Sequence, residues 1–183
     1  MKKSKTKIMV ECSIVIALST ALSLVKIIPM PLGGSVTLLS MLPVCYMSIR
    51  HGLKWGLGTS FVYSCIQLAL DFAAAMGWGL SAARWVGMIA FDYIIPFTVL
   101  GLSGLFAKKG FVGVMSGTAL AIFLRFVSHI ISGSFVFDIW MPEGWGSPFV
   151  YSVAYNGAYM LPELIMTLVG AAIVYKALAN RNL

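Results

Sequence analysis

Long runs of apolar side chains, broken by short groups of basic residues, constrain this chain more than any other feature. The first run, Ile8 to Ile28, has about 21 residues, enough for a helix that crosses the roughly 30 Å core of a bilayer. Further runs follow at about 36–49, 53–75, 85–106, 112–135 and 149–178. With 60% apolar and 10% charged residues, the chain is too apolar for a soluble domain. We therefore expect an all-α membrane protein with six transmembrane helices and one domain over residues 1–183.

The first run is expected to stay in the protein as a transmembrane helix. It is too long for the core of a signal peptide, and no convincing small-residue cleavage site precedes Pro29. The sequence PMPLGGS that follows predicts a loop, because its prolines remove backbone donors and its glycines add conformational freedom. The second run is short and carries Pro43, which predicts a tilted or kinked helix.

Basic residues indicate how the six predicted spans are oriented. With an inward amino terminus, ten of the thirteen Lys and Arg residues fall on the inner side: Lys2, Lys3, Lys5, Lys7, Arg50, Lys54, Lys108, Lys109, Lys176 and Arg181. The positive-inside rule then predicts that both termini are cytoplasmic and that the loops at 29–35 and 137–149 face outside. The net charge of +7 does not indicate nucleic-acid binding, since the cations are not gathered on one face.

Motifs of common enzymes and metal sites are missing from the sequence. We find no HExxH, no GxSxG, no P-loop and no glycine-rich dinucleotide turn, which predicts that the protein is not an enzyme. The cysteines stand alone and predict neither a metal site nor a disulfide framework: Cys12, Cys45 and Cys65. An intramembrane hydrolase built on Ser132, Ser134 and His129 is a distant alternative without a nucleophile elbow.

Polar side chains sunk in the apolar runs are the candidate functional residues. Asp92, Arg125, His129 and Asn156 are costly in hydrocarbon unless they face a cavity or one another. Each alone is explained by a structural ion pair, a core histidine or an amide that joins two helices. Because they fall at similar depth, beside an aromatic-rich loop after residue 135, we expect a site for a small, flat, partly charged molecule.

Four segments then carry a family resemblance: GGSVTLLSMLPVCYMSIRHGLKWGL, FDYIIPFTVLGLSGLF, FLRFVSHIISGSFVF and VYSVAYNGAYMLP. Together they resemble the thiamine-specific substrate-binding subunit (S component, ThiT type) of energy-coupling factor transporters, over nearly the whole chain. The resemblance implies a six-helix cell-membrane protein that binds thiamine from outside with high affinity. It also implies docking on a transmembrane coupling subunit with two ATPase subunits, and no cofactor of its own.

The resemblance also implies which residues bind thiamine: Asp92, Tyr93, His129, Gly133, Phe137, Tyr151, Ser152 and Asn156. In this hypothesis Asp92 neutralises or hydrogen-bonds the ligand, His129 and Phe137 stack on it, and Tyr151 and Asn156 fix its pyrimidine. Ala17 and Ala21 form an AxxxA pair like the one by which these subunits contact the coupling subunit, although internal packing explains such spacing too. Another vitamin or a thiamine precursor is the alternative ligand.

One position departs from the family pattern. Some relatives carry a tryptophan in the first outer loop, where this chain has about Gly34. Two expectations follow. Either the backbone of residues 29–35 closes the site, or Trp140 or Trp145 supplies the missing ring.

Overall fold

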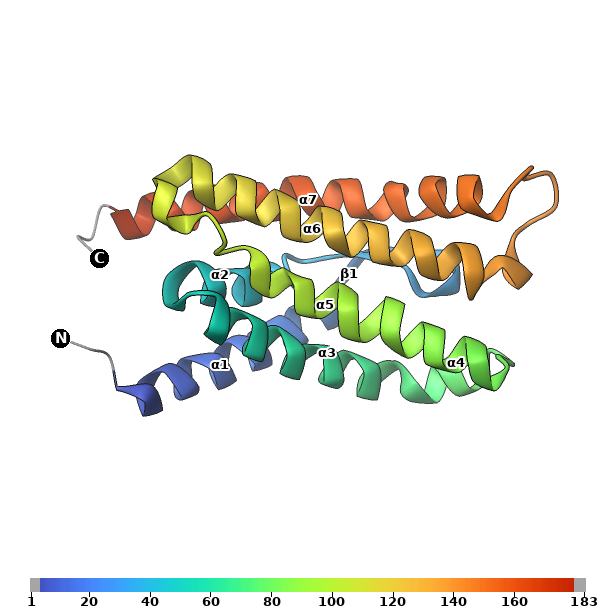
Figure 1. Cartoon of the computed structure of the whole chain (residues 1–183), viewed down its shortest axis with the longest axis horizontal. Coiled ribbons are helices and arrows are strands. Elements are labelled where there is room, and N and C mark those ends of the chain that lie inside the picture. The colour runs from blue at the N-terminus through green and yellow to red at the C-terminus, as the bar shows by residue number, and fades with distance from the viewer. Residues whose placement is uncertain (1–3, 180–183) are drawn as a thin grey trace.

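Helices that lie roughly along one long axis make up most of the computed structural model, which describes residues 4–179 (Figure 1). Four are continuous: α1 (Lys5–Leu24), α3 (Leu53–Met76), α6 (Gly110–Phe135) and α7 (Pro148–Ala179). A fifth is built end to end from α4 (Ala82–Met88), the π-helical turn η2 (Ile89–Ile94), α5 (Ile95–Thr98) and η3 (Val99–Leu102). Short 3-10 turns complete the helical parts: η4 (Ala107–Lys109) and η5 (Asp138–Trp140).

Length and composition identify four stretches that could cross a membrane: Lys5–Leu24, Leu53–Met76, Ala82–Phe135 and Pro148–Ala177. The third contains two helices, the α4–η3 helix and α6, which run in opposite directions in Figure 1. The prediction of an all-helical membrane protein is therefore confirmed.

The second predicted span, 36–49, differs from the observed structure. Strand β1 (Lys26–Pro29) pairs antiparallel with β2 (Ser35–Thr37) around the 3-10 turn η1 (Pro31–Gly33). Helix α2 (Leu42–His51) then has ten residues, about 15 Å, which is too short to cross a bilayer alone. The prolines and the positive φ of Gly33 (96°) favour this hairpin over a helix. The hairpin and α2 together stand where a complete second spanning helix was expected.

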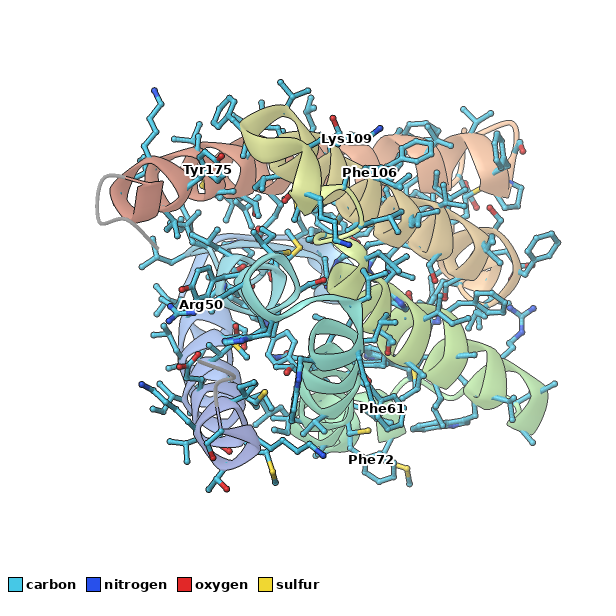
Figure 2. The ribbon with its side chains drawn as sticks, turned by 60° about the vertical axis from the view of Figure 1, so that its left-hand side comes forward. Arg50, Phe61, Phe72, Phe106, Lys109 and Tyr175 are labelled. Carbon is cyan, nitrogen blue, oxygen red and sulfur yellow. The ribbon has the colours of Figure 1, made fainter. Side chains whose placement is uncertain are left out.

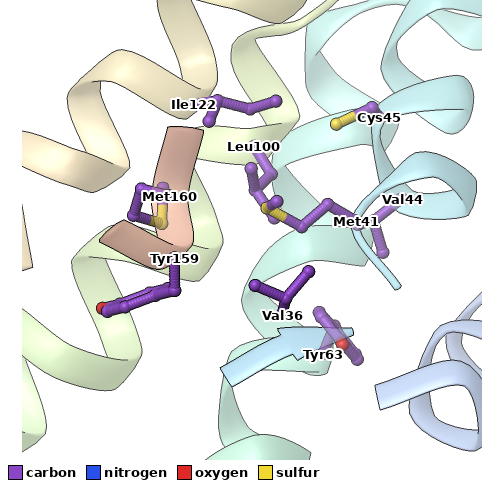
Figure 3. Packing of buried hydrophobic residues seen from close by; sticks show 9 residues of the cluster. All are labelled: Val36, Met41, Val44, Cys45, Tyr63, Leu100, Ile122, Tyr159 and Met160. Atoms are coloured by element: carbon purple, nitrogen blue, oxygen red, sulfur yellow. The ribbon is translucent and has the colours of Figure 1, made fainter. Parts of the chain in front are cut away.

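The main hydrophobic core lies where the hairpin, α2, α3, η3, α6 and α7 meet (Figure 3). Its fully buried members include Val44, Cys45, Tyr63 and Leu100. Tyr63 also meets Phe97 edge to face, with the ring centroids 5.4 Å apart. This packing fixes β2, through the buried Val36, against the long helices, while every residue of β1 is exposed.

Large apolar side chains cover much of the bundle's outside. Phe61 and Phe72 of α3 are both about half exposed, at 48% relative accessibility, and Figure 2 shows them pointing away from the bundle. Helix α1 is the most peripheral span, with only 6% of its most apolar window buried. Extensive exposed apolar surface is expected of helices that face lipid and is rare on soluble monomers.

Basic residues gather at one end of the bundle. The start of α1, the α2–α3 turn, η4 and the end of α7 all lie at the same end in Figure 1. These segments carry the described residues of the predicted inner set: Lys5, Lys7, Arg50, Lys54, Lys108, Lys109 and Lys176. Lys2, Lys3 and Arg181 lie outside the described residues. The clustering is the one that the positive-inside rule requires of a single membrane face.

Candidate binding cavity

A cavity of about 370 Å³ lies inside the bundle, bounded by α3, the α4–η3 helix, α6, α7 and the hairpin. Its size falls within the usual range for small-molecule sites. All eight sequence-predicted site residues line it: Asp92, Tyr93, His129, Gly133, Phe137, Tyr151, Ser152 and Asn156. The structure thus brings together residues from three separate helices and the segment after α6, while their contact with a ligand stays a prediction.

The π-helical turn η2 presents Asp92 and Tyr93 to this cavity. Pro96 has no N–H, so the Asp92 carbonyl loses its ordinary helical donor four residues later. In the same turn, the N–H of Ile95 bonds to the carbonyl of Ala90, five residues back, which is the π-helical spacing. Such a wide turn re-aims side chains within an otherwise regular helix.

The Asp92 carboxylate is held by two groups of α6. His129 Nδ1 lies 3.0 Å from Asp92 Oδ1, and the Ser132 hydroxyl donates to Oδ2. A neutral imidazole that donates from Nδ1 leaves Nε2 as an acceptor. Among the described residues, that Nε2 atom has no partner.

The same contacts argue against the hydrolase alternative. A nucleophilic serine needs the histidine as its base, with the acid behind the histidine. Here Asp92 stands between Ser132 and His129, and Ser134 donates to the carbonyl of Ile130 at 2.7 Å. Ser132 and Ser134 are therefore not arranged as nucleophiles.

Asn156 hydrogen-bonds within its own helix α7 and across to α6. Its Nδ2 donates to the Ser152 carbonyl at 2.9 Å and to the His129 carbonyl at 3.3 Å. Its Oδ1 accepts a 2.7 Å hydrogen bond from Tyr159. Asn156 thus ties α7 to α6 at His129 and lines the cavity.

Gly133 and Ser152 mark the closest approach of α6 and α7. A Cβ atom added at Gly133 would lie 2.2 Å from Ser152 Oγ and 3.4 Å from Asn156 Nδ2. Ser152 Oγ itself donates to the Ile130 carbonyl at 3.1 Å. Only glycine fits at position 133, because any side chain there would collide with Ser152.

The aromatic wall of the cavity differs from the prediction. Trp140 and Trp145 do not line the cavity and are 47% and 39% exposed. The indole present is Trp78, whose ring packs edge to face on Phe137 with centroids 5.4 Å apart. Phe135, at the end of α6, and Phe149, at the start of α7, are also exposed.

The hairpin closes one side of the cavity with its backbone. The N–H of Gly34 donates to the Tyr155 hydroxyl at 3.1 Å, and that hydroxyl donates to the Pro31 carbonyl. A Cβ at Gly34 would lie 2.8 Å from the Tyr155 hydroxyl oxygen. Position 34 therefore leaves no room for an indole, and the expectation of backbone closure fits the geometry.

Several cavity residues were not predicted as site residues. Trp78, Tyr155 and Tyr159 line the cavity, as do Asp71 and Gln67 of α3. A signal existed for two of them, since Tyr155 and Tyr159 follow Tyr151 at a spacing of four on one helix face. Asp71 accepts a 3.2 Å hydrogen bond from the Tyr93 hydroxyl, which links α3 to the π-turn.

Arg125 and Glu163 also line the cavity. Arg125 does not pair with Asp92. Its guanidinium carbon lies 4.0 Å from the centroid of the Phe97 ring. Glu163 is 3% exposed and accepts from the N–H and hydroxyl of Thr37, at 2.5 and 2.7 Å.

A second, open groove contains the AxxxA pair. Ala17 and Ala21 are exposed and line it together with Ser13, Thr20, Val62 and Ile66. The groove therefore lies between α1 and α3, on the surface of the bundle. Within residues 4–179, the two alanines are not buried against another helix.

The fold and the cavity define a multi-pass, all-helical membrane protein with a polar, aromatic-lined chamber among its helices. Residues 9–182 match the model of the family described as Thiamine transporter protein (Thia_YuaJ). The chain is 32% identical to the thiamine transporter ThiT of Bacillus subtilis (strain 168), over 91% of this chain and 89% of that protein. A solved structure of ThiT from Listeria monocytogenes has the same fold, with a TM-score of 0.72 at 20% identity, covering 94% of this chain and 95% of that one.

The chain belongs to the thiamine transporter protein family. Membership places it among transport proteins and not among enzymes. The predicted family resemblance is confirmed.

Proposed function

We propose that the cavity binds thiamine and that the chain is the substrate-specificity subunit of an energy-coupling factor importer. The observation that carries this proposal is a carboxylate, Asp92, held inside a chamber walled by aromatic rings. Thiamine combines a permanently positive thiazolium with a flat aminopyrimidine, and such a cation is stabilised by one nearby carboxylate and by aromatic faces.

The charge of the lining supports a monocationic ligand. Asp71, Asp92 and Glu163 contribute three negative charges, while Lys26 and Arg125 contribute two positive charges. With His129 counted as neutral, the formal net charge of the lining is −1, although the formal net charge of the whole chain is +7. Binding of a monocation then leaves the site electrically neutral, which limits the cost of placing charge within the membrane.

Within this proposal each part of the ligand has a partner. Asp92 offsets the positive charge, and the rings of His129 and Phe137 stack on the ligand's planar groups. Tyr151 and the remaining capacity of Asn156 orient the pyrimidine by hydrogen bonding. Tyr93, Gly133 and Ser152 set the positions of these groups.

Capture from outside is part of the same proposal. The basic end of the bundle also carries the start of α1 and the end of α7, and the positive-inside rule assigns that end to the cytoplasm. The far ends of α3 and α6, with the start of α7, lie at the opposite end in Figure 1. The residues at these far ends include Trp78, Phe137 and Tyr151, which line the cavity, and this supports a mouth on the outer side.

Transport against a gradient requires energy from a partner. The sequence has no P-loop, and the family resemblance implies a coupling subunit with two ATPases. The exposed groove of Ala17 and Ala21 is the docking surface in this proposal, because small side chains let another helix approach closely.

Titration of the purified protein with thiamine, followed by intrinsic tryptophan fluorescence, tests the ligand. We expect saturable quenching in the wild type, with a smaller change in Trp78→Phe because that indole lines the cavity. Competition with the free aminopyrimidine alcohol tests the precursor alternative. Tighter binding of the pyrimidine half than of thiamine, or no saturable thiamine binding, would contradict the proposal.

A further inference from the structure

The inner part of the cavity contains polar atoms that the surrounding protein does not satisfy. In the part of the chain that the structure describes, Arg125 Nε and Nη1 have no hydrogen-bond partner, and neither does Glu163 Oε2. Both residues line the cavity, and Glu163 is only 3% exposed. Buried polar groups of this kind are costly unless something pairs with them, so the pair indicates an additional ligand contact.

The helix register places these two residues beyond the Asp92 contacts. Helices α6 and α7 are antiparallel, and Asn156 Nδ2 meets the His129 carbonyl at 3.3 Å. Arg125 is one turn earlier than His129 on α6, and Glu163 is two turns later than Asn156 on α7. Both therefore lie deeper than His129, on the side away from Tyr151.

The orientation of Glu163 Oε2 is fixed by the hydrogen bonds of the other carboxylate oxygen, Oε1. Oε1 accepts from the Thr37 N–H at 2.5 Å and from the Thr37 hydroxyl at 2.7 Å, and that hydroxyl lies 2.6 Å from Ser40 Oγ. Arg125 is likewise positioned, with its guanidinium carbon 4.0 Å from the centroid of the Phe97 ring. An acceptor and a set of donors are thus preorganised at the inner end of the cavity.

We propose that Arg125 and Glu163 form an inner subsite for a neutral alcohol group of the ligand. A hydroxyl both donates and accepts, so it can donate to Glu163 Oε2 and accept from Arg125. The two protein charges cancel, which favours a neutral group over a phosphate that Glu163 repels or an ammonium that Arg125 repels. This subsite presupposes the thiamine-binding function proposed above, in which the hydroxyl is that of thiamine's hydroxyethyl tail.

The test compares two ligands on four proteins. Thiamine and its analogue with an ethyl group in place of hydroxyethyl are titrated into the wild type, Arg125→Met, Glu163→Gln and a control, Gln67→Ala. Gln67 lines the same cavity from α3, where its amide donates to Ser23 at 2.9 Å. In the wild type, thiamine is expected to bind at least about tenfold tighter than the ethyl analogue, because losing the hydroxyl leaves two buried groups unpaired.

The ratio of the affinity for thiamine to that for the ethyl analogue is expected to fall to about 1 in Arg125→Met and to decrease in Glu163→Gln. Gln67→Ala is expected to keep the wild-type ratio. Measuring the ratio of two affinities makes the result independent of a general weakening of either variant. An unchanged ratio in both variants, with thiamine still bound, would overturn the subsite and leave the thiamine function intact. No thiamine binding to the wild type would instead overturn the proposed function.

Binding of thiamine monophosphate distinguishes a subsite for a neutral alcohol from a subsite for an anion. The subsite predicts that the phosphate ester binds at least about tenfold more weakly than thiamine and that Glu163→Gln narrows this gap. If the ester bound as tightly as thiamine and lost affinity specifically in Arg125→Met, the inner end would be an anion site, and the alcohol proposal would be wrong.

Discussion

His129 Nδ1 lies 3.0 Å from Asp92 Oδ1, although 37 residues separate the two in the chain. The contact joins α6 to the π-turn of the neighbouring helix, and the Ser132 hydroxyl fixes the second carboxylate oxygen. The carboxylate is therefore oriented before any ligand arrives, which reduces the entropy lost on binding. The imidazole's other nitrogen, Nε2, has no hydrogen-bond partner among the described residues.

Replacing Asp92 by asparagine should weaken thiamine binding by roughly 10- to 100-fold. The change keeps the size of the side chain but removes the charge that faces the thiazolium, and a hydrogen bond to a charged group contributes about 1.5–3 kcal/mol. Calorimetric titration of the two purified proteins measures the difference. Ser132→Ala, which keeps the charge and removes one orienting hydroxyl, should cost less; equal affinity of Asp92→Asn and wild type would refute the role of the carboxylate.

Gly133→Ala should distort the contact between α6 and α7. The added Cβ would lie 2.2 Å from Ser152 Oγ, so one helix must shift, at a cost of about 1–3 kcal/mol. We expect a lower unfolding temperature and weaker thiamine binding together. Gly58→Ala on α3 is the matched control, because a Cβ there meets nothing within 4 Å. If both variants matched the wild type, the close approach at Gly133 would be unimportant.

Tyr155→Phe should release the hairpin from α7. The lost hydroxyl accepts from the Gly34 N–H at 3.1 Å and donates to the Pro31 carbonyl. Two hydrogen bonds of about 1 kcal/mol each predict roughly thirtyfold faster thiamine dissociation, measurable by stopped-flow displacement. Tyr175→Phe, near the other end of the same helix, should leave the dissociation rate unchanged. A normal rate in Tyr155→Phe would mean that the hairpin does not retain the ligand.

The sequence predicted the long helices and the polar cavity set because both depend on strong local signals. Charged and amide residues such as Asp92 and Asn156 are rare in apolar runs, so their pattern indicated a shared interior. The prediction was wrong over the hairpin: it placed residues 26–28 in the first helix, 29–35 in a loop and 36–37 in the second helix, whereas α1 ends at Leu24. Strands β1 and β2 are too short to show periodicity, and the hairpin is held by contacts with Tyr155 and Glu163. Trp78 was not predicted as a cavity residue, since its place beside Phe137 depends on how α3 ends.

The spacing of the polar residues could not decide which residue of α6 contacts Asp92. Arg125 and His129 lie one turn apart, and either could face Asp92 from α6. The structure shows His129 in that place, with Arg125 over the Phe97 ring. Helix rotation and the widened π-turn decide the choice, and neither can be read from a 3.6-residue period.

Asp138 should give the protein a small acid-dependent loss of stability. The hydrogen bond from Arg84 lowers the pKa of Asp138 below its ordinary value. A carboxyl whose pKa is lower in the folded state stabilises above its unfolded pKa, about 3.9, and loses that contribution as the pH falls through the lower, folded value. Because the pair is partly exposed, the effect is at most about 1 kcal/mol.

Thermal unfolding in detergent from pH 7 to pH 3 measures this effect against Asp138→Asn. The wild type should be slightly more stable at pH 5–7, and the two proteins should converge as the pH falls below about 4. A constant difference over the whole range would show that the Arg84 contact does not depend on the Asp138 charge.

A bulky residue at position 17 should separate transport from binding. Ala17→Trp fills the groove between α1 and α3, which the proposed partner helix would occupy. We expect normal thiamine affinity in the purified protein and at least about tenfold lower uptake in cells that supply the coupling module. Leu18→Trp, exposed on the same helix but outside the groove, is the control. Loss of binding together with uptake would indicate internal packing.

An experimental structure with thiamine bound is the most direct test of the cavity as the transport site. We predict ligand density inside the bundle, with the thiazolium near Asp92 and His129 and the hydroxyethyl end toward Arg125 and Glu163. Thiamine bound outside this cavity, or Asp92 and His129 turned away from the ligand, would contradict the account.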